Sequence, residues 1–266
     1  MRKQILSTAA SGASAYNFLQ NGDFATTRGL ELVFKTRRTR RLRSELNYTF
    51  SDARGTGSTT VSALSGVEND SGLPTIIAPL DFNQTHRGNI YLDYRYAAGD
   101  GGLLQRAGAN LLLKFDSGHN YTLVDGTIGQ RGPELGGILA CDDPRNRSPI
   151  GGVNRATTPW TFEVDLRVDK GFALFGTDVR AYAYVLNLFN RRNDINVYGR
   201  TGNAGDDGFL TDPQLSGQIV EASGGDTYEE LYRAINLDHR QHYWFTEGGD
   251  LYGAPRQVRF GLQFDL

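Results

Sequence analysis

Hydrophobic and polar residues alternate one by one along several stretches of this chain. The last stretch runs from Pro255 to Leu266, and its polar or glycine positions lie between apolar ones. Side chains point to opposite faces at successive positions of an extended strand. The stretch therefore predicts a strand with one polar face and one apolar face, the latter made by Val258, Phe260, Leu262, Phe264 and Leu266.

Earlier stretches of similar length show the same alternation, most regularly WTFEVDLRVD at 160–169. The period slips at Leu186–Phe189, which predicts a bulge or the end of a strand. Together with the terminal stretch, the pattern predicts seven strands and an all-β fold. The six earlier ones cover residues 29–36, 42–50, 87–96, 107–116, 160–169 and 178–185.

The connections between these strands alternate strictly in length, short and then long. The long ones are residues 54–85, 117–158 and 190–250. Antiparallel barrels of the bacterial outer membrane have short periplasmic turns and long extracellular loops. We therefore predict an antiparallel transmembrane β-barrel whose C-terminus is periplasmic. The three long connections would be extracellular loops without regular structure, and a ligand would bind there.

Composition narrows the class of protein further. No apolar run approaches the roughly 18 residues of a membrane-spanning helix, while a barrel strand needs only every second residue to be apolar. The net charge of −2 argues against a general nucleic-acid binder. Cys141 is the single cysteine, which excludes an internal disulfide and a cysteine-rich zinc site. Residues 1–24 begin like a signal peptide without its apolar core, so we interpret them as a loop or the end of a missing preceding strand.

Aromatic and charged residues take positions that a barrel would use. One aromatic group lies toward the predicted outer ends of the strands (Tyr48, Phe50, Trp160, Phe162), and another toward the periplasmic ends (Tyr94, Tyr96, Phe172). Such rings favour the level of the lipid headgroups. Charges on the polar face are expected to pair across strands, and these are Glu163, Asp165, Arg167, Asp169, Asp178, Arg180 and Arg259.

Several longer motifs resemble one known family. They are GLEL at 29–32, NYTFSDA at 47–53, PLDFNQTHRGNI at 79–90, VLNLFNRRNDINVY at 185–198, TGNAGDDGFL at 201–210 and the closing PRQVRFGLQFDL. In this order and spacing, they resemble the C-terminal part of the barrel of TonB-dependent outer-membrane receptors. The closest likeness is to the type that has a carboxypeptidase-regulatory-like N-terminal module. The resemblance covers most of residues 25–266, and it departs at Leu266, where the family usually has an aromatic residue.

The resemblance carries expectations about the whole protein. Seven strands cannot close a bacterial barrel, which has an even number, so residues 1–24 would hide an eighth strand or the barrel would be larger. The family resemblance implies the larger barrel, in which this chain would be about the last third of about 22 strands. The whole would import a scarce ligand across the outer membrane of a Gram-negative cell. It would be no enzyme and would need no cofactor. The implied partners are outer-membrane lipid, the plug and earlier strands of the receptor, the TonB complex through the missing N-terminal part, and the barrel-assembly machinery, but no nucleic acid.

Other readings of the pattern remain open. A soluble β-sandwich binding module would use the same alternation, with the long connections as its binding surface. An outer-membrane hydrolase would need a serine, a histidine and an acid together, and Asp116, Ser117 and His119 form the one local cluster of these types.

Metal chemistry has two candidate segments. His239 and His242, with Asp238, lie in a loop that lacks the helical spacing of a metal motif, so we expect no metal site there. Asp206, Asp207 and Asp212 are similar to a calcium loop but lack EF-hand spacing, and we interpret this segment as a solvated turn.

Overall fold

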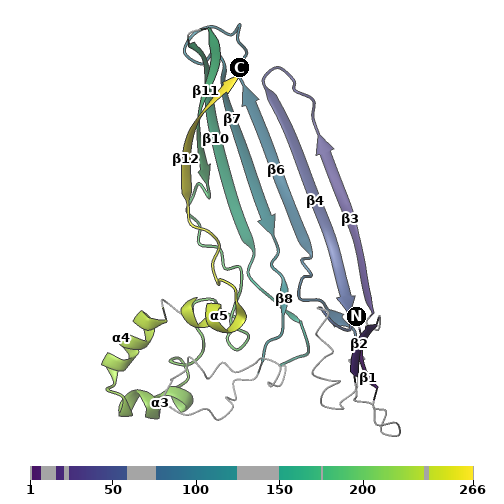
Figure 1. Cartoon of the computed structure of the whole chain (residues 1–266), viewed down its shortest axis with the longest axis vertical. Helices are drawn as coiled ribbons and strands as arrows, with labels where there is room; N and C mark the ends of the chain where they lie inside the picture. Colours follow the sequence, from purple (N-terminus) through teal and green to yellow (C-terminus); the bar gives the residue numbers. More distant parts are fainter. Residues whose placement is uncertain are drawn as a thin grey trace.

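The computed structural model describes residues 2–6, 16–20, 24–58, 76–124, 150–174, 176–236 and 240–265. The main sheet of the described chain is antiparallel, with strands in the order β12-β11-β10-β7-β6-β4-β3, and the short strand β5 pairs with β4 (Figure 1). The strands on this path are β3 (Ala25–Lys35), β4 (Leu42–Gly55), β6 (His86–Arg95), β7 (Ala107–Asp116), β10 (Thr161–Leu174), β11 (Thr177–Leu186) and β12 (Gln257–Asp265). The seven predicted strands are confirmed, as is the all-β class.

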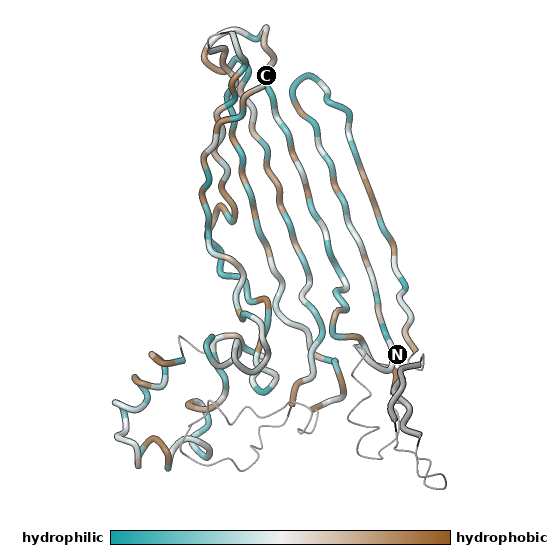
Figure 2. The backbone as a smooth tube through the Cα atoms, viewed as in Figure 1, coloured by the Kyte–Doolittle hydropathy of each residue, from teal (hydrophilic) through white to brown (hydrophobic). Residues whose placement is uncertain are grey.

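The register aligns the alternation of every strand with that of its neighbours. Val164 on β10 stands opposite Leu113, and the same row continues across β6, β4 and β3 through Ile90, Leu46 and Phe34. Most apolar positions of these strands therefore gather on one face, and the opposite face is mainly polar, with Val33 and Leu112 as exceptions. In Figure 2 the two kinds of residue alternate along each strand. Because the side-chain period is two, a slip of one residue in any strand would move its apolar set to the polar face.

The connections separate by length at the two ends of the sheet. The links β3–β4, β6–β7 and β10–β11 are short and lie at the end where the chain also terminates (Figure 1). The links β4–β6, β7–β10 and β11–β12 are long and lie at the opposite end. The predicted alternation in length is thus a spatial separation. It defines a short-turn end and a long-connection end.

The long connections carry regular structure, which corrects the prediction that they are irregular. Short strands occur in the first two: β5 (Ala78–Pro79), β8 (Asn120–Tyr121) and β9 (Ala156–Thr157). The third contains helices α3 (Pro213–Ala222), α4 (Asp226–Ile235) and α5 (Arg240–Glu247). Asp212 caps α3 by accepting a hydrogen bond from the Gln214 N–H, and Pro213 occupies its first turn.

None of the helices in the described ranges has the length and apolar content of a membrane-crossing helix.

The N-terminal stretch 1–24 contains a hairpin that its sequence pattern did not predict. Strands β1 (Arg2–Leu6) and β2 (Tyr16–Gln20) pair with each other in a sheet of their own. They add no strand to the main sheet, so the described residues of this stretch do not supply the eighth strand that a small closed barrel would require.

Buried apolar residues concentrate in the long connections. Tyr198, Ala204, Leu251 and Tyr252 form a cluster, and Tyr243 of α5 packs against it. Leu80 in the first connection and Val124 in the second are also buried. The long-connection end is therefore a packed layer, whereas neither face of the main sheet supports a comparable cluster among the described residues.

Close approach of strands explains one glycine and gives a test of the sheet edge. A Cβ on Gly29 would lie 2.3 Å from the Phe50 carbonyl oxygen, a backbone atom that cannot turn aside. We expect Gly29→Ala to lower the free energy of unfolding by about 1–3 kcal/mol through overpacking. In Gly99→Ala the new methyl meets no atom within 4 Å. That control should change stability by less than about 0.5 kcal/mol in the same denaturant titration. Equal losses would contradict the β3–β4 register.

Candidate functional site

The apolar face of the sheet is exposed. Phe260 on β12 is 79% exposed, and Phe34 on β3 is 62% exposed. On β12, Val258, Leu262 and Phe264 are also exposed, so the described members of the predicted apolar set share one face; Leu266 lies outside the described residues. No described helix packs extensively against the sheet. Large exposed apolar surfaces in folded proteins mark contacts with another protein or with a membrane.

Aromatic side chains form a band near each end of this apolar face. At the long-connection end, the ring of His86 lies 5.5 Å from Phe50, 6.2 Å from Tyr48 and 5.6 Å from Trp160, and Trp160 stacks on Phe162. At the short-turn end, Tyr94 and Tyr96 meet edge to face at 5.5 Å. The predicted outer group is therefore a cluster in space, and His86 joins it although the sequence pattern did not include a histidine. Of the other predicted group, the ring contact joins Tyr94 and Tyr96 and does not include Phe172.

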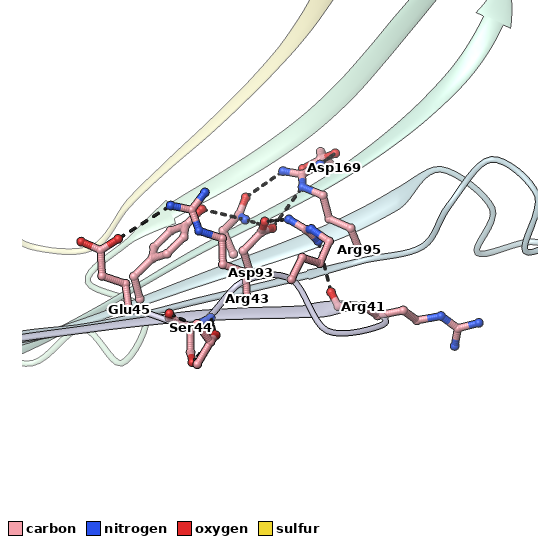
Figure 3. A network of polar contacts seen from close by, with 11 residues as sticks. Arg41, Arg43, Ser44, Glu45, Asp93, Arg95 and Asp169 are labelled. Carbon is pink, nitrogen blue, oxygen red and sulfur yellow. Dashed lines mark hydrogen bonds and ion pairs between the residues drawn. The ribbon is translucent and has the colours of Figure 1, made fainter. Parts of the chain in front are cut away.

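The polar face holds a network of buried acids and paired arginines. Asp93 on β6 and Asp169 on β10 are both about 5% exposed, and Arg95 reaches Asp93 at 3.0 Å and Asp169 at 3.1 Å (Figure 3). Arg38 pairs with Asp93 from the β3–β4 turn, and Arg180 approaches Asp169 at 3.7 Å. Buried carboxylates require such partners because an unpaired charge away from water is costly.

A second group on this face is centred on Lys114 of β7. Its ammonium lies 2.8 Å from Glu163 and 3.0 Å from Asp165, both on β10. Asp165 is 2% exposed and also accepts a hydrogen bond from the Asn187 N–H just after β11. The predicted cross-strand pairing of charges is confirmed for both groups.

Some polar atoms of this face have no hydrogen-bond partner. Asp169 Oδ1 and Arg167 Nε are buried without one, although the Arg167 guanidinium stacks over Tyr182 at 4.5 Å. Buried polar atoms in proteins are satisfied by protein groups or ordered water in the great majority of cases. These two atoms are exceptions to that rule within the described residues.

Asparagine side chains join the first two long connections to each other. The Asn83 amide donates to Asn120 Oδ1 at 2.8 Å, and Asn120 donates to the Asn154 carbonyl at 2.9 Å. Asn154 adopts a positive φ of 53°, and its amide donates to the Pro79 carbonyl at 3.0 Å. All three are buried, so their bonds hold the base of the connections together. Sequence periodicity has no signal for such a network, because its members are distant in the chain.

The hydrolase cluster suggested by the sequence is not assembled. Ser117 Oγ accepts from the His86 N–H at 3.0 Å, and Asp116 pairs with Arg87 at 3.3 Å. The His119 ring lies 3.0 Å from both the Ile195 carbonyl and Asn196 Oδ1. No hydrogen bond joins Asp116, Ser117 and His119 to one another within the described part of the chain. His119 instead ties the second long connection to the third.

The aspartates of the suggested calcium loop serve the protein itself. Asp207 is 1% exposed and accepts bonds from the Tyr232 hydroxyl and from the Asn236 amide, which lies at 3.2 Å. Asp212 caps α3 and pairs with Arg200 at 2.6 Å. The interpretation as a solvated turn is wrong for Asp207, which anchors α4.

Of the two candidate metal ligands, His239 lies outside the described residues. His242 lies on α5, but its side chain is not among the described ones. Across the ranges that the structure describes, no group of three or more metal-ligating side chains occurs.

Comparison with known proteins gives no family. No family model matches the chain, and no curated protein matches it.

The buried charge at Asp165 yields a test of the polar face. We expect Asp165→Ala to cost about 2 kcal/mol of unfolding free energy, because it removes the Lys114 pair and leaves the Asn187 N–H unsatisfied. Asp178 pairs with Arg106 at 2.8 Å, but its side chain is 64% exposed. Asp178→Ala should therefore cost less than about 1 kcal/mol. If chemical denaturation gives equal losses for the two variants, the Asp165 network contributes nothing beyond a surface pair.

Proposed function

We propose that this chain is part of a β-barrel of the Gram-negative outer membrane. The observation that supports this is the exposed apolar face, which spans seven strands and is bordered by aromatic bands. A barrel wall in lipid has this arrangement, apolar toward hydrocarbon and polar toward the lumen, with rings at both headgroup levels. A sheet in water would leave the same face with no favourable partner.

The strands have the length that a membrane wall requires. The seven strands of the sheet have 9 to 14 residues each. A tilted transmembrane strand needs about 9–11 residues to cross the hydrocarbon. Those that exceed this length would carry the wall beyond the bilayer. We therefore place the bilayer between the two aromatic bands.

The sheet edges imply further strands. Within the described residues, β3 and β12 each pair on one side only. Unpaired backbone groups in hydrocarbon cost several kcal/mol each, so a membrane sheet closes on itself. We propose that other parts of a longer receptor supply the remaining strands, for a total of about 22 as in the outer-membrane transporters with a plugged lumen.

The polar face and the long-connection end suggest what such a barrel does. Asp93, Asp165 and Asp169, with their arginine and lysine partners, would line a polar lumen. The packed layer at the long-connection end would form the extracellular surface that selects a ligand. On the family resemblance, we propose energy-coupled uptake of a scarce ligand, driven through a TonB complex that contacts another part of the receptor.

The soluble β-sandwich requires a different partner for the apolar face. A sandwich buries one sheet face against a second sheet about 10 Å away. In the described residues, β1–β2 and β8–β9 are the other sheets, and neither covers the apolar face. We therefore favour the membrane proposal.

The terminal strand gives the test of this function. Leu262 lies on the apolar face, while its neighbour Gln263 pairs with Arg180 on the polar face. An arginine facing lipid costs about 2–4 kcal/mol near the bilayer midplane. We expect Leu262→Arg in the outer-membrane protein to reduce its level in the outer membrane strongly and Gln263→Arg to leave it nearly unchanged. If Gln263→Arg is the more damaging, the faces are inverted and the proposal fails.

The orientation has its own test. Ser223 is exposed between α3 and α4 at the long-connection end, and Gly99 is exposed in the β6–β7 turn. With Cys141 replaced by serine, a membrane-impermeant thiol reagent added to intact cells should label Ser223→Cys and not Gly99→Cys. Both should react after the outer membrane is broken. Labelling of Gly99→Cys alone in intact cells would reverse the orientation.

A further inference from the structure

An open cavity rich in arginine lies where the third long connection leaves β11 and returns to β12. Its volume is about 520 Å³, and its lining includes Arg191, Arg192, Arg240 and Tyr252. Segments 190–194 and 252–256 lie side by side here, because Asp194 and Tyr252 form a bridge and the Arg256 N–H donates to Asn190 Oδ1 at 2.9 Å. We call this cavity the arginine groove.

The groove has more positive than negative charge. The Arg192 guanidinium lies 3.5 Å from the centroid of the Tyr252 ring, and Arg191 Nε donates to Asn193 Oδ1 at 3.0 Å. Neither arginine pairs with a carboxylate in the described part of the chain. Arg240 is held by Asp250, whose Oδ1 lies 3.0 Å from Arg240 Nε. Of the three guanidinium groups, that of Arg240 alone is therefore paired with a carboxylate among the described residues.

The carboxylate of Asp250 offsets only one of the three positive charges of the groove near neutral pH. The hydrogen bond from Arg240 lowers the pKa of Asp250 below its usual value, and the Tyr252 N–H adds a weaker effect of the same sign. The carboxylate is therefore charged throughout the neutral range, and one pair accounts for both Asp250 and Arg240. Arg191 and Arg192 keep donors for an external anion.

The groove adjoins the aromatic band at the edge of the apolar face. The Arg191 guanidinium lies 5.1 Å from the centroid of Phe162, and Phe162 stacks on Trp160 in that band. Phe189, two residues before Arg191, is 73% exposed. An anion in the groove that carried an acyl chain could therefore extend the chain along the apolar face without leaving the protein surface.

We propose that the arginine groove binds the phosphate of an anionic membrane-lipid headgroup. Planar guanidinium groups match phosphate oxygens with two parallel hydrogen bonds, and basic residues beside a membrane-facing surface attract anionic lipids. The position beside Phe162 and Trp160 favours a lipid over a free phosphate ion. The inference rests on the proposed membrane contact of the apolar face.

Tryptophan fluorescence gives a direct test, because Trp160 and Trp244 are the two tryptophans of the chain. The 266-residue chain with Trp244→Phe is placed in uncharged maltoside micelles. It is titrated with phosphatidic acid or phosphatidylcholine that carry brominated acyl chains, which quench a nearby indole. We expect phosphatidic acid to quench Trp160 at a lower concentration than phosphatidylcholine does.

Variants assign the preference to the groove. Arg191→Gln with Arg192→Gln should raise the half-quenching concentration of phosphatidic acid about tenfold, as expected when charge-assisted bonds to phosphate are lost. The value for phosphatidylcholine should not change. Arg192→Gln alone should give part of the effect, and the described contact of Arg192 is only with Tyr252, so the fold is retained. Arg233→Gln on α4, which removes an exposed i,i+4 pair outside the groove, is the matched control and should behave as the parent.

Each other outcome contradicts a definite part of the proposal. Equal quenching by the two lipids, or no change in the arginine variants, overturns the headgroup site while the membrane contact stands. Displacement of the lipid by an equal concentration of inorganic phosphate would show a site for the free ion and overturns the lipid assignment. Absence of quenching by both lipids would mean that the apolar face does not meet acyl chains, so the proposed function fails together with this inference.

Discussion

The antiparallel register of the main sheet is the constraint on which the rest of the structure depends. It places Val164, Leu113, Ile90, Leu46 and Phe34 in one row and puts Asp93, Asp165 and Asp169 on the opposite face. Buried acids meet Arg95 and Lys114 only in this register. A slip of one residue would move acids among apolar side chains and break the ion pairs at the same time. The ion pairs and the exposed apolar face are thus two results of a single alignment.

The strands could be predicted from sequence because a period of two is visible within each stretch. WTFEVDLRVD at 160–169 needs no distant information to be recognised as a two-faced strand, and β10 covers it from Thr161. The pairing of charges across strands could be predicted from the same period of two. Helices α3, α4 and α5 were missed because the long stretch 190–250 was judged by its lack of a strand pattern, although Asp212-Pro213 is a helix-start signal. The Asp207 anchor and the Asn83–Asn120–Asn154 network were beyond sequence reasoning, since their partners lie 25 to 37 residues away.

The candidate site likewise has one part that could be predicted from the sequence and one part that could not. The exposed apolar residues Val258, Phe260, Leu262 and Phe264 were predictable from alternation alone. The arginine groove was not, because Arg192 and Tyr252 are far apart in sequence and meet only where two segments of the third connection run together. The Arg-Arg pair at 191–192 was part of a longer family-like motif and gave no separate signal of a binding site. The long-connection end therefore contains both a packed layer and the arginine groove, next to the edge of the apolar face.

Spin-label accessibility along β12 is the measurement that tests the membrane account most directly. Labels are placed singly at positions 258 to 264 in the protein reconstituted in lipid bilayers, and collisions with oxygen are compared with collisions with a water-soluble nickel complex. Oxygen concentrates in hydrocarbon and the nickel complex in water. If one face of β12 meets lipid, oxygen dominates at the positions of Val258, Phe260, Leu262 and Phe264, and the nickel complex dominates at Arg259, Gly261 and Gln263. Uniform accessibility along the strand, or the inverse alternation, would contradict the membrane account.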